Sequence, residues 1–407
     1  MKNTLKLLYI SLLLCFVACT EVDLCKSPTH PHHSYLDFRF HWQDGYANNH
    51  SDSMMVVAVR PKNVLRYDFR VTSQESNNKG VMLSPIEERL NDEYIDESGN
   101  VQKSNNDKLW VRPGIYKFVA FGIESESYEN CYVTTNVNED DEQVNTDYSD
   151  LLITYRSYKS DAPEVTGKYG EWKSYNTYSD YISSFANPVY MDHLNYIDVP
   201  VIEEKDGNVR LDFSPFPITQ HVTFQLEIEK EDGVVVDSII AEISGVPAVM
   251  ELSTALLRPD KSYKMLFKMN YPALESKEDS LKTTSLSCTG DIETTGIIRS
   301  ASGDLQTGPG ILSLAVYSHV LKENVVGLPP RSFYKVFYAG INLYNTLSTT
   351  KVLEWDEEKG KYKQVGREIV LEIGQVLKQN KDRIVNGGSD DSGVDNWFDG
   401  ENLILDI

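Results

Sequence analysis

Hydrophobic residues in this chain alternate with polar ones over many short stretches, and long helical periodicity is nearly absent. In the stretch 35–42, Leu36, Phe38 and Phe40 are separated by single polar residues. The same alternation recurs at 64–71, 209–213 and 222–228. A period of two places one set of side chains in a core and the other in water, so each stretch predicts a half-buried β-strand.

Turn-forming residues separate these stretches from further strand candidates. Apolar or alternating runs predict strands at 54–59, 114–122, 234–243, 263–269, 284–289, 310–320, 334–343 and 364–373. Asp232 followed by Gly233 lies between two such runs and predicts a β-hairpin. Only 251–257 and 374–380 are candidates for short helices. Many short strands at turn-punctuated intervals favour an all-β fold built from antiparallel β-sandwiches.

A charged, turn-rich stretch at 203–208 separates two runs that each begin with alternating strands. Domain junctions tend to fall in exposed polar segments. We therefore expect an N-terminal β-sandwich domain at 34–208 and a C-terminal one at 209–407. About 200 residues suffice to bury a core, so each part is long enough to fold alone.

The first residues read as a leader rather than as part of the fold. Lys2 and Lys6 precede an apolar run at 7–17, and Ala18 stands directly before Cys19. The run is too short to span a bilayer of roughly 30 Å, which favours a removed signal peptide at 1–18. Ending in a lipobox, this signal predicts acylation of Cys19, with palmitate as a suitable label and membrane anchoring through the lipid. The alternative is an ordinary secretory signal that happens to contain cysteines.

Residues 19–33 contain Pro28 and Pro31, have no periodicity, and are predicted to be a lipidated tether. The formal net charge of the chain is -22. Nucleic-acid binding requires clustered cations, so this balance argues against a nucleic-acid partner. Because the same charge repels anionic head groups, we expect membrane contact through the lipid on Cys19 alone.

Three cysteines remain outside the leader and the lipid site: Cys25, Cys131 and Cys288. They are far apart and form no CxxC pair, so neither a metal site nor a disulfide framework is indicated. One disulfide bridge with a spare thiol remains an alternative, but three separate buried thiols are the favoured interpretation.

Metal and cofactor sites are not expected. The histidine-rich start of the chain is broken by proline, and the acidic groups lack the spacing of a calcium loop. The residues considered are His30, His32, His33, His41, Asp37 and Asp44, the acidic loop 139–142, and Asp390, Asp391, Asp395 and Asp399. Solvated loops are the favoured interpretation, and calcium binding by the acidic loops stays open.

Catalytic motifs are also missing: the sequence contains no GxSxG, HExxH, GxxxxGK[ST] or strand-to-helix GxGxxG. A pair of carboxylates of the glycosidase type is left open, because only separation in space identifies one. We expect that this protein is not an enzyme. Aromatic residues that are equally suited to a sugar-stacking platform or to strand positions are Tyr155, Tyr158, Trp172, Tyr175, Tyr178 and Tyr181.

Three pieces of sequence together resemble one family. They are the acylated cysteine with its tether and first strand (19–42), the segment AEISGVPA (241–248), and VDNW (394–397) before a short closing strand. This combination is similar to the fimbrillin-like lipoproteins of Bacteroidales, in particular the group related to the minor-fimbria anchor protein. The resemblance implies two tandem transthyretin-like β-sandwiches and a role as fimbrial anchor or accessory subunit. At the level of single residues it transfers only Cys19.

Within that family, acidic residues behind the acylated cysteine, here Glu21 and Asp23, resemble a signal for export to the outer face. No clear protease-processing arginine follows the first strand, since Arg60 and Arg66 lie within or beside strand candidates. The sequence hypothesis is thus a non-enzymatic, outward-facing outer-membrane lipoprotein. It would serve as an anchor or as an accessory or tip subunit of a fimbria-like adhesive assembly, joined to other subunits by strand addition. The alternative is a surface glycan-binding lipoprotein.

Overall fold

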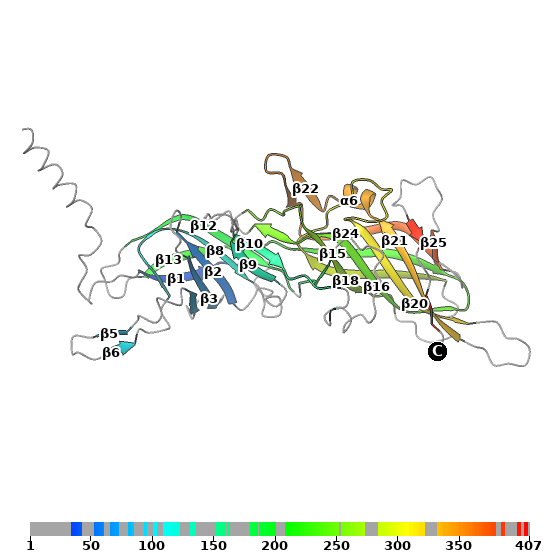
Figure 1. Cartoon of the computed structure of the whole chain (residues 1–407), viewed down its shortest axis with the longest axis horizontal. Helices are drawn as coiled ribbons and strands as arrows, with labels where there is room; N and C mark the ends of the chain where they lie inside the picture. Colours follow the sequence, from blue (N-terminus) through cyan, green and yellow to red (C-terminus); the bar gives the residue numbers. More distant parts are fainter. Residues whose placement is uncertain are drawn as a thin grey trace, which may run out of the picture.

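The structure is a computed structural model of the 407-residue chain. It describes residues 34–42, 53–60, 66–72, 80–84, 93–95, 101–103, 109–122, 131–135, 151–159, 162, 180–185, 187–200, 208–251, 254–272, 284–321, 332–379, 384–386, 397–399 and 403–405. The described part is mostly β-strand, as the two-residue period predicts. Figure 1 shows an elongated molecule with the early strands towards one end and the late strands towards the other.

The first half contains two sheets that share one core. A three-stranded sheet has the order β13-β1-β7, and a six-stranded sheet has the order β14-β12-β8-β2-β3-β4. Their strands are β1 (Ser34–Phe40), β2 (Ser53–Val59), β3 (Arg66–Thr72), β4 (Gly80–Ser84), β7 (Trp110–Val111), β8 (Gly114–Gly122), β12 (Tyr190–Val199), β13 (Asn208–Phe213) and β14 (Phe216–Pro217). The alternating residues Leu36, Phe38 and Phe40 all point into this core.

The second half is built around two larger sheets. One has the order β11-β18-β16-β20-β21-β26, with β27 also on β21, and the other has the order β19-β15-β24-β25. Their strands are β11 (Tyr181–Ile182), β15 (Gln220–Lys230), β16 (Val234–Pro247), β18 (Ser262–Met269), β19 (Ser285–Thr294), β20 (Ile311–Leu321), β21 (Ser332–Asn342), β24 (Glu368–Gln379), β25 (Ile384–Asn386), β26 (Trp397–Asp399) and β27 (Leu403–Leu405). The closing strand expected near the end of the chain is confirmed as β27.

The smaller elements complete the described part. Two hairpins join β5 (Glu93–Ile95) to β6 (Val101–Lys103) and β22 (Leu353–Asp356) to β23 (Lys361–Gln364). A third small sheet joins β9 (Cys131–Thr135), β10 (Leu151–Tyr155) and β17 (Val249–Glu251). The helix α6 (Tyr344–Thr350) follows β21 and buries Leu347.

Strand β13 corrects the predicted start of the C-terminal domain at residue 209. It pairs in parallel with β1, so that Leu211 lies opposite Phe38 and Phe213 opposite Phe40. The rings of Phe40 and Phe213 stack with their centroids 5.6 Å apart. The hydrophobic side chains that the alternation assigned to a core are therefore buried, but in the core of the first half.

The two halves also exchange strands. Within the third sheet, β10 from the first half pairs with β17 from the second. Strand β11 extends the large sheet by pairing in parallel with β18. A single hydrophobic cluster consequently includes Val119 and Ile153 as well as Phe224 and Leu314.

The turn at Asp232 and Gly233 exists, but the hairpin predicted there is wrong. Gly233 has the positive φ of 83° that such a turn requires. The strands on either side pair elsewhere: β15 lies between β19 and β24, whereas β16 lies between β18 and β20. The chain thus crosses from one sheet to the facing sheet, because both edges of each strand are occupied by more distant partners.

Both short helix candidates are also wrong. Residues 374–379 continue β24, and 251 ends β17. The segment 241–248 contains the end of β16, where the register shifts between Ser244 and Val246. Gly245 supplies a φ of 87° at this β-bulge.

Candidate functional site

A cavity of about 450 Å³ lies at one end of the β19-β15-β24 sheet, where the segment between β11 and β12 meets it. It is lined by Ser184, Phe185, Pro188, His221, Asp291, Ile292, Glu293, Arg367 and Glu368. The antiparallel register of β15 and β19 places His221 opposite Glu293 and Thr223 opposite Asp291. The polar residues therefore come from the water-facing side of this sheet, at the point where the segment 184–188 covers it.

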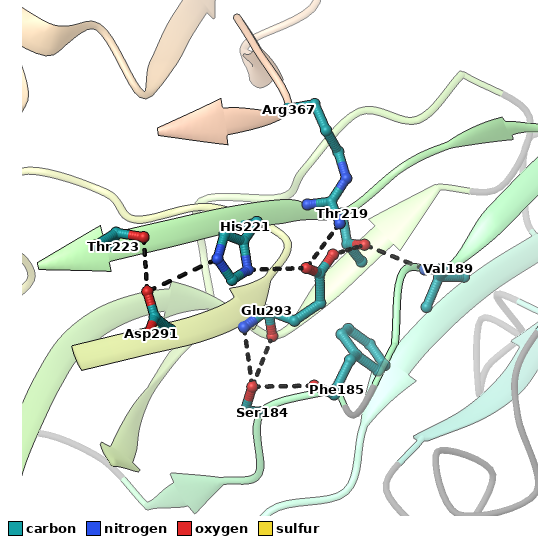
Figure 2. A network of polar contacts seen from close by, with 9 residues as sticks. All are labelled: Ser184, Phe185, Val189, Thr219, His221, Thr223, Asp291, Glu293 and Arg367. Carbon is teal, nitrogen blue, oxygen red and sulfur yellow. Dashed lines mark hydrogen bonds and ion pairs between the residues drawn. The ribbon is translucent and has the colours of Figure 1, made fainter. Parts of the chain in front are cut away.

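Glu293 is the centre of the polar network at this cavity (Figure 2). Its carboxylate accepts a hydrogen bond from the hydroxyl of Thr219, and a second from Nη2 of Arg367 at 2.8 Å. Thr219 in turn accepts a bond from the backbone N–H of Val189 at 3.1 Å. Ser184 accepts one from the backbone N–H of Glu293 at 2.9 Å. The network thus links the segment between β11 and β12 to β19 and to Arg367, the residue that precedes β24.

A second carboxylate lies on the open side of the cavity. Asp291 accepts a 2.6 Å hydrogen bond from the hydroxyl of Thr223. His221 lies between the two carboxylates, with Nε2 3.7 Å from Asp291 and Nδ1 3.8 Å from Glu293. His221 and Asp291 are exposed, whereas the Glu293 side chain is buried.

Burial raises the pKa of Glu293, while the Thr219 hydroxyl and the Arg367 guanidinium lower it, and the net direction is upward. The Nη1 atom of Arg367 is buried without a hydrogen-bond partner among the described residues. Since the hydroxyls of Thr219 and Ser184 are both occupied by structural hydrogen bonds, the arrangement acts as a clamp between the two halves.

The open edge of β24 begins at this cavity. On its inner side, β24 pairs in parallel with β15 along most of its length. On its outer side, the described residues form a ladder only at Leu377–Gln379, with β25. Over residues 368–376 the outer edge is therefore free of a neighbouring strand within the described part of the chain.

The direction of the backbone groups along this edge follows from the parallel ladder. The N–H of His221 donates to the carbonyl of Arg367 at 2.8 Å. In a parallel pair, every second residue directs its N–H and C=O to the same neighbour. The intervening residues Glu368, Val370 and Glu372 consequently direct their backbone groups outwards, while Ile369 and Leu371 bury their side chains in the core.

Other long edges of these two sheets have backbone partners along part of their length. The backbone of Thr289 on β19 exchanges two hydrogen bonds with Asn270, at 2.6 and 2.8 Å, and Glu293 accepts one from Phe185. On the facing sheet, β26 and β27 together run along β21. Over residues 368–376, the outer edge of β24 thus has no strand partner in the described residues, and the helix α6 lies close to this strand.

The structure places few of the metal candidates. His41 is described, and its Nε2 lies 2.8 Å from Asp212 on the adjacent strand. Asp37 binds Arg39. Among the residues that the structure describes, no group of three or more potential ligands could hold a metal ion. His30, His32, His33, Asp44, the loop 139–142, and the side chains of Asp390, Asp391, Asp395 and Asp399 lie outside the described residues.

Two of the tyrosines considered for a sugar platform are core residues. Tyr155 is buried and packs on Phe185 with the ring centroids 4.8 Å apart. Tyr181 is buried as well, and its backbone forms a bridge with Tyr158. Tyr155 and Tyr181 therefore cannot stack on a sugar at the surface. Trp172, Tyr175 and Tyr178 lie outside the described residues.

Cys19, the predicted acylation site, and Cys25 also lie outside the described residues, as does the side chain of Cys131. Cys288 is a free buried thiol, which fits both three separate thiols and one bridge with a spare thiol. Burial raises its pKa to about 12. Within the described residues, no helix is long and apolar enough to cross a membrane.

Sequence reasoning missed both the Glu293 clamp and the β24 edge. The clamp residues are scattered over positions 184–367, so no local sequence pattern predicts that they lie together. A weak signal for the edge was present, because Val370 is an apolar residue on the polar side of an alternating run and is about half exposed.

No family model matches this chain, and no curated protein matches it. Solved structures do. A candidate adhesin from Bacteroides ovatus is 13% identical, with a TM-score of 0.39 over 84% of this chain and 88% of its own. A candidate adhesin from Bacteroides thetaiotaomicron is 12% identical, with a TM-score of 0.39 over 90% and 98%.

The fimbrial anchor protein Mfa2 from Porphyromonas gingivalis is 10% identical, with a TM-score of 0.36 over 90% of this chain and 95% of its own. Several of the matched structures are named as adhesins or fimbrial proteins, and one from Bacteroides thetaiotaomicron is named as a polysaccharide-binding protein.

Proposed function

We propose that this protein is an outer-membrane surface lipoprotein that anchors or terminates a fimbria-like adhesive assembly without catalysing a reaction. Cleavage after residue 18 and acylation of Cys19 would attach it to the membrane. The β-sheets would be arranged as two tandem transthyretin-like β-sandwiches, which form a rigid, elongated base for a neighbouring subunit. The lipobox pattern and the family resemblance of the sequence support the first part of this proposal.

The observation that carries the proposal is the open outer edge of β24. An exposed strand edge presents a row of backbone donors and acceptors to which another chain can add a strand. Glu368, Val370 and Glu372 direct their backbone groups outwards at this edge, and no neighbouring strand of the described residues pairs with them there. A fimbrial subunit that donates a strand would continue the β19-β15-β24 sheet and would thereby be fixed to the lipoprotein.

The edge can be blocked without breaking the sheet. Proline is tolerated on an edge strand when its missing N–H faces away from the ladder, which is the situation of Val370. Val370→Pro should therefore leave the β15 ladder intact but prevent strand addition. Val370→Thr keeps the N–H and a β-branched side chain, and is the matched control.

The experiment measures fimbrial polymer on cells and in the culture medium by immunoblot and electron microscopy. An anchor with Val370→Pro should shed fimbriae into the medium, whereas Val370→Thr should retain them. Circular dichroism of both purified variants checks that the fold is unchanged. If Val370→Pro folds normally and retains fimbriae as well as the wild type does, β24 is not the attachment edge.

A further inference from the structure

The solvent side of the β24 edge carries a short charge pattern. Glu368, Val370 and Glu372 project from the same face of the strand, and all three are exposed. Of the ion pairs in the described residues, none involves Glu368 or Glu372. Within the described part of the chain, an exposed valine flanked by two unpaired carboxylates therefore lies directly beside the open edge.

The neighbouring strand does not neutralise these charges. On β15, His221 lies opposite Glu368, Thr223 opposite Val370 and Gln225 opposite Glu372, so no lysine or arginine of this strand faces the carboxylates. The nearest lysine on β24, Lys378, already pairs with Glu229 at 3.6 Å. Towards the cavity, Glu368 is followed by Asp291 and by the Glu293–Arg367 ion pair. The side chains that project from the solvent face of β24 at 368–372 therefore carry two carboxylates and no cation.

This pattern disfavours pairing with a second copy of the same chain. If two β24 edges met in antiparallel register at Val370, each Glu368 would lie opposite a Glu372 of the other copy. Like charges directly opposite one another on paired strands are destabilising. The edge is therefore protected against self-association but remains open to a strand of complementary charge.

We infer, on the basis of the proposed function, that the partner strand reads basic–x–aliphatic–x–basic on its solvent face. The aliphatic residue would lie opposite Val370, and the basic residues opposite Glu368 and Glu372, at the spacing of about 4.5–5.5 Å of directly opposed side chains. Because the pattern is the same in both directions, it holds for parallel and for antiparallel addition.

The test uses two labelled nine-residue peptides. One has lysine at its third and seventh positions, valine at its fifth and threonine elsewhere, and the other has glutamate in place of lysine. Both are titrated by fluorescence anisotropy with the full-length mature protein, with the Glu368→Lys, Glu372→Lys double variant, and with Val370→Pro. Circular dichroism confirms that each variant is folded.

The wild type should bind the lysine peptide at least about fivefold more tightly than the glutamate peptide at low salt, and less so at high salt. The double variant should reverse this preference, and Val370→Pro should bind neither peptide. If both peptides bind the wild type equally and Val370→Pro abolishes binding, strand addition stands and the inferred pattern is wrong. If Val370→Pro binds the lysine peptide as well as the wild type does, the attraction is not strand pairing. If neither peptide binds the wild type or the double variant, which both keep the N–H of residue 370, then both the proposed edge and the inferred pattern are wrong.

Discussion

The hydroxyl of Tyr181 donates a 2.5 Å hydrogen bond to the carboxylate of Glu242, which is completely buried. Tyr181 lies in β11, which precedes β12 of the first half in the sequence, whereas Glu242 lies in the middle of β16. The ammonium group of Lys264 lies 4.3 Å from the centroid of the Tyr181 ring. Burial lowers the pKa of Lys264, and the nearby Glu242 and Asp180 raise it. This contact joins the two halves through a buried polar group.

Tyr181→Phe should destabilise the protein by about 1–3 kcal/mol, because it removes a hydrogen-bond donor from a buried carboxylate while leaving the ring in place. Urea denaturation measures the change in the free energy of unfolding. Tyr196→Phe is the control, since Tyr196 is 66% exposed and its substitution should change the stability by less than about 0.5 kcal/mol. Equal effects of the two substitutions would show that the Tyr181 hydroxyl contributes nothing.

Gly245→Ala should be strongly destabilising. A Cβ at this position would lie 2.7 Å from the carbonyl oxygen of Ile298 and 2.8 Å from the backbone nitrogen of Gly310, at a φ of +87°. We expect a loss of about 3 kcal/mol or more, from both the contacts and the backbone conformation.

Gly360→Ala separates these two causes. Gly360 has a φ of +61°, but a Cβ added there would meet no atom within 4 Å. Only the backbone term applies at this position, so the loss should be about 1–2 kcal/mol. Thermal or chemical denaturation of both variants gives the comparison. A loss at position 245 no larger than that at 360 would rule out the steric contribution.

Glu293 makes the stability depend on pH. Because its pKa is raised in the folded protein, the folded state binds the proton more tightly than the unfolded chain. This contribution is complete below the unfolded pKa of about 4.3 and is lost as the pH rises through the higher folded pKa. The difference in unfolding free energy between the wild type and Glu293→Gln should therefore grow as the pH falls from the folded pKa towards the unfolded pKa of about 4.3. The growth should be about 1.4 kcal/mol for each unit of raised pKa.

Chemical denaturation at several pH values measures this difference. Gln225→Ala, on the exposed face of β15, removes no titrating group and should differ from the wild type by the same amount at every pH. A wild-type advantage over Glu293→Gln that shrinks on acidification would contradict the raised pKa.

Cys19→Ser should release the protein from membranes, since the acyl chains are the proposed anchor and each buried methylene contributes about 0.8 kcal/mol. Membrane fractionation and labelling with radioactive palmitate measure this. Cys25→Ser is the matched control and should keep both the label and the membrane attachment. A Cys19→Ser protein that stays in the membrane fraction, together with an unlabelled wild type, would exclude lipidation at this position.

The alternation of polar and apolar residues determined which segments are strands and which side chains are buried. Leu211 and Phe213 are core residues, as their spacing predicts, and Gly233 forms a turn. The exposed Val370 also stands out from the sequence, as an apolar residue at a polar position. These features are local, because each depends only on the two faces of a strand or on one residue's backbone freedom.

Only the tertiary structure decided which strands are neighbours. Leu211 and Phe213 lie in the first half because β13 pairs with β1, and the runs around Gly233 pair with distant strands instead of each other. The burial of Tyr181, the Glu293 clamp and the open edge of β24 all follow from these long-range pairings. Those pairings are made by backbone hydrogen bonds, whose donors and acceptors are the same for every residue with an N–H. A period of two therefore predicts which face of a strand is buried, but it does not predict which strands pair.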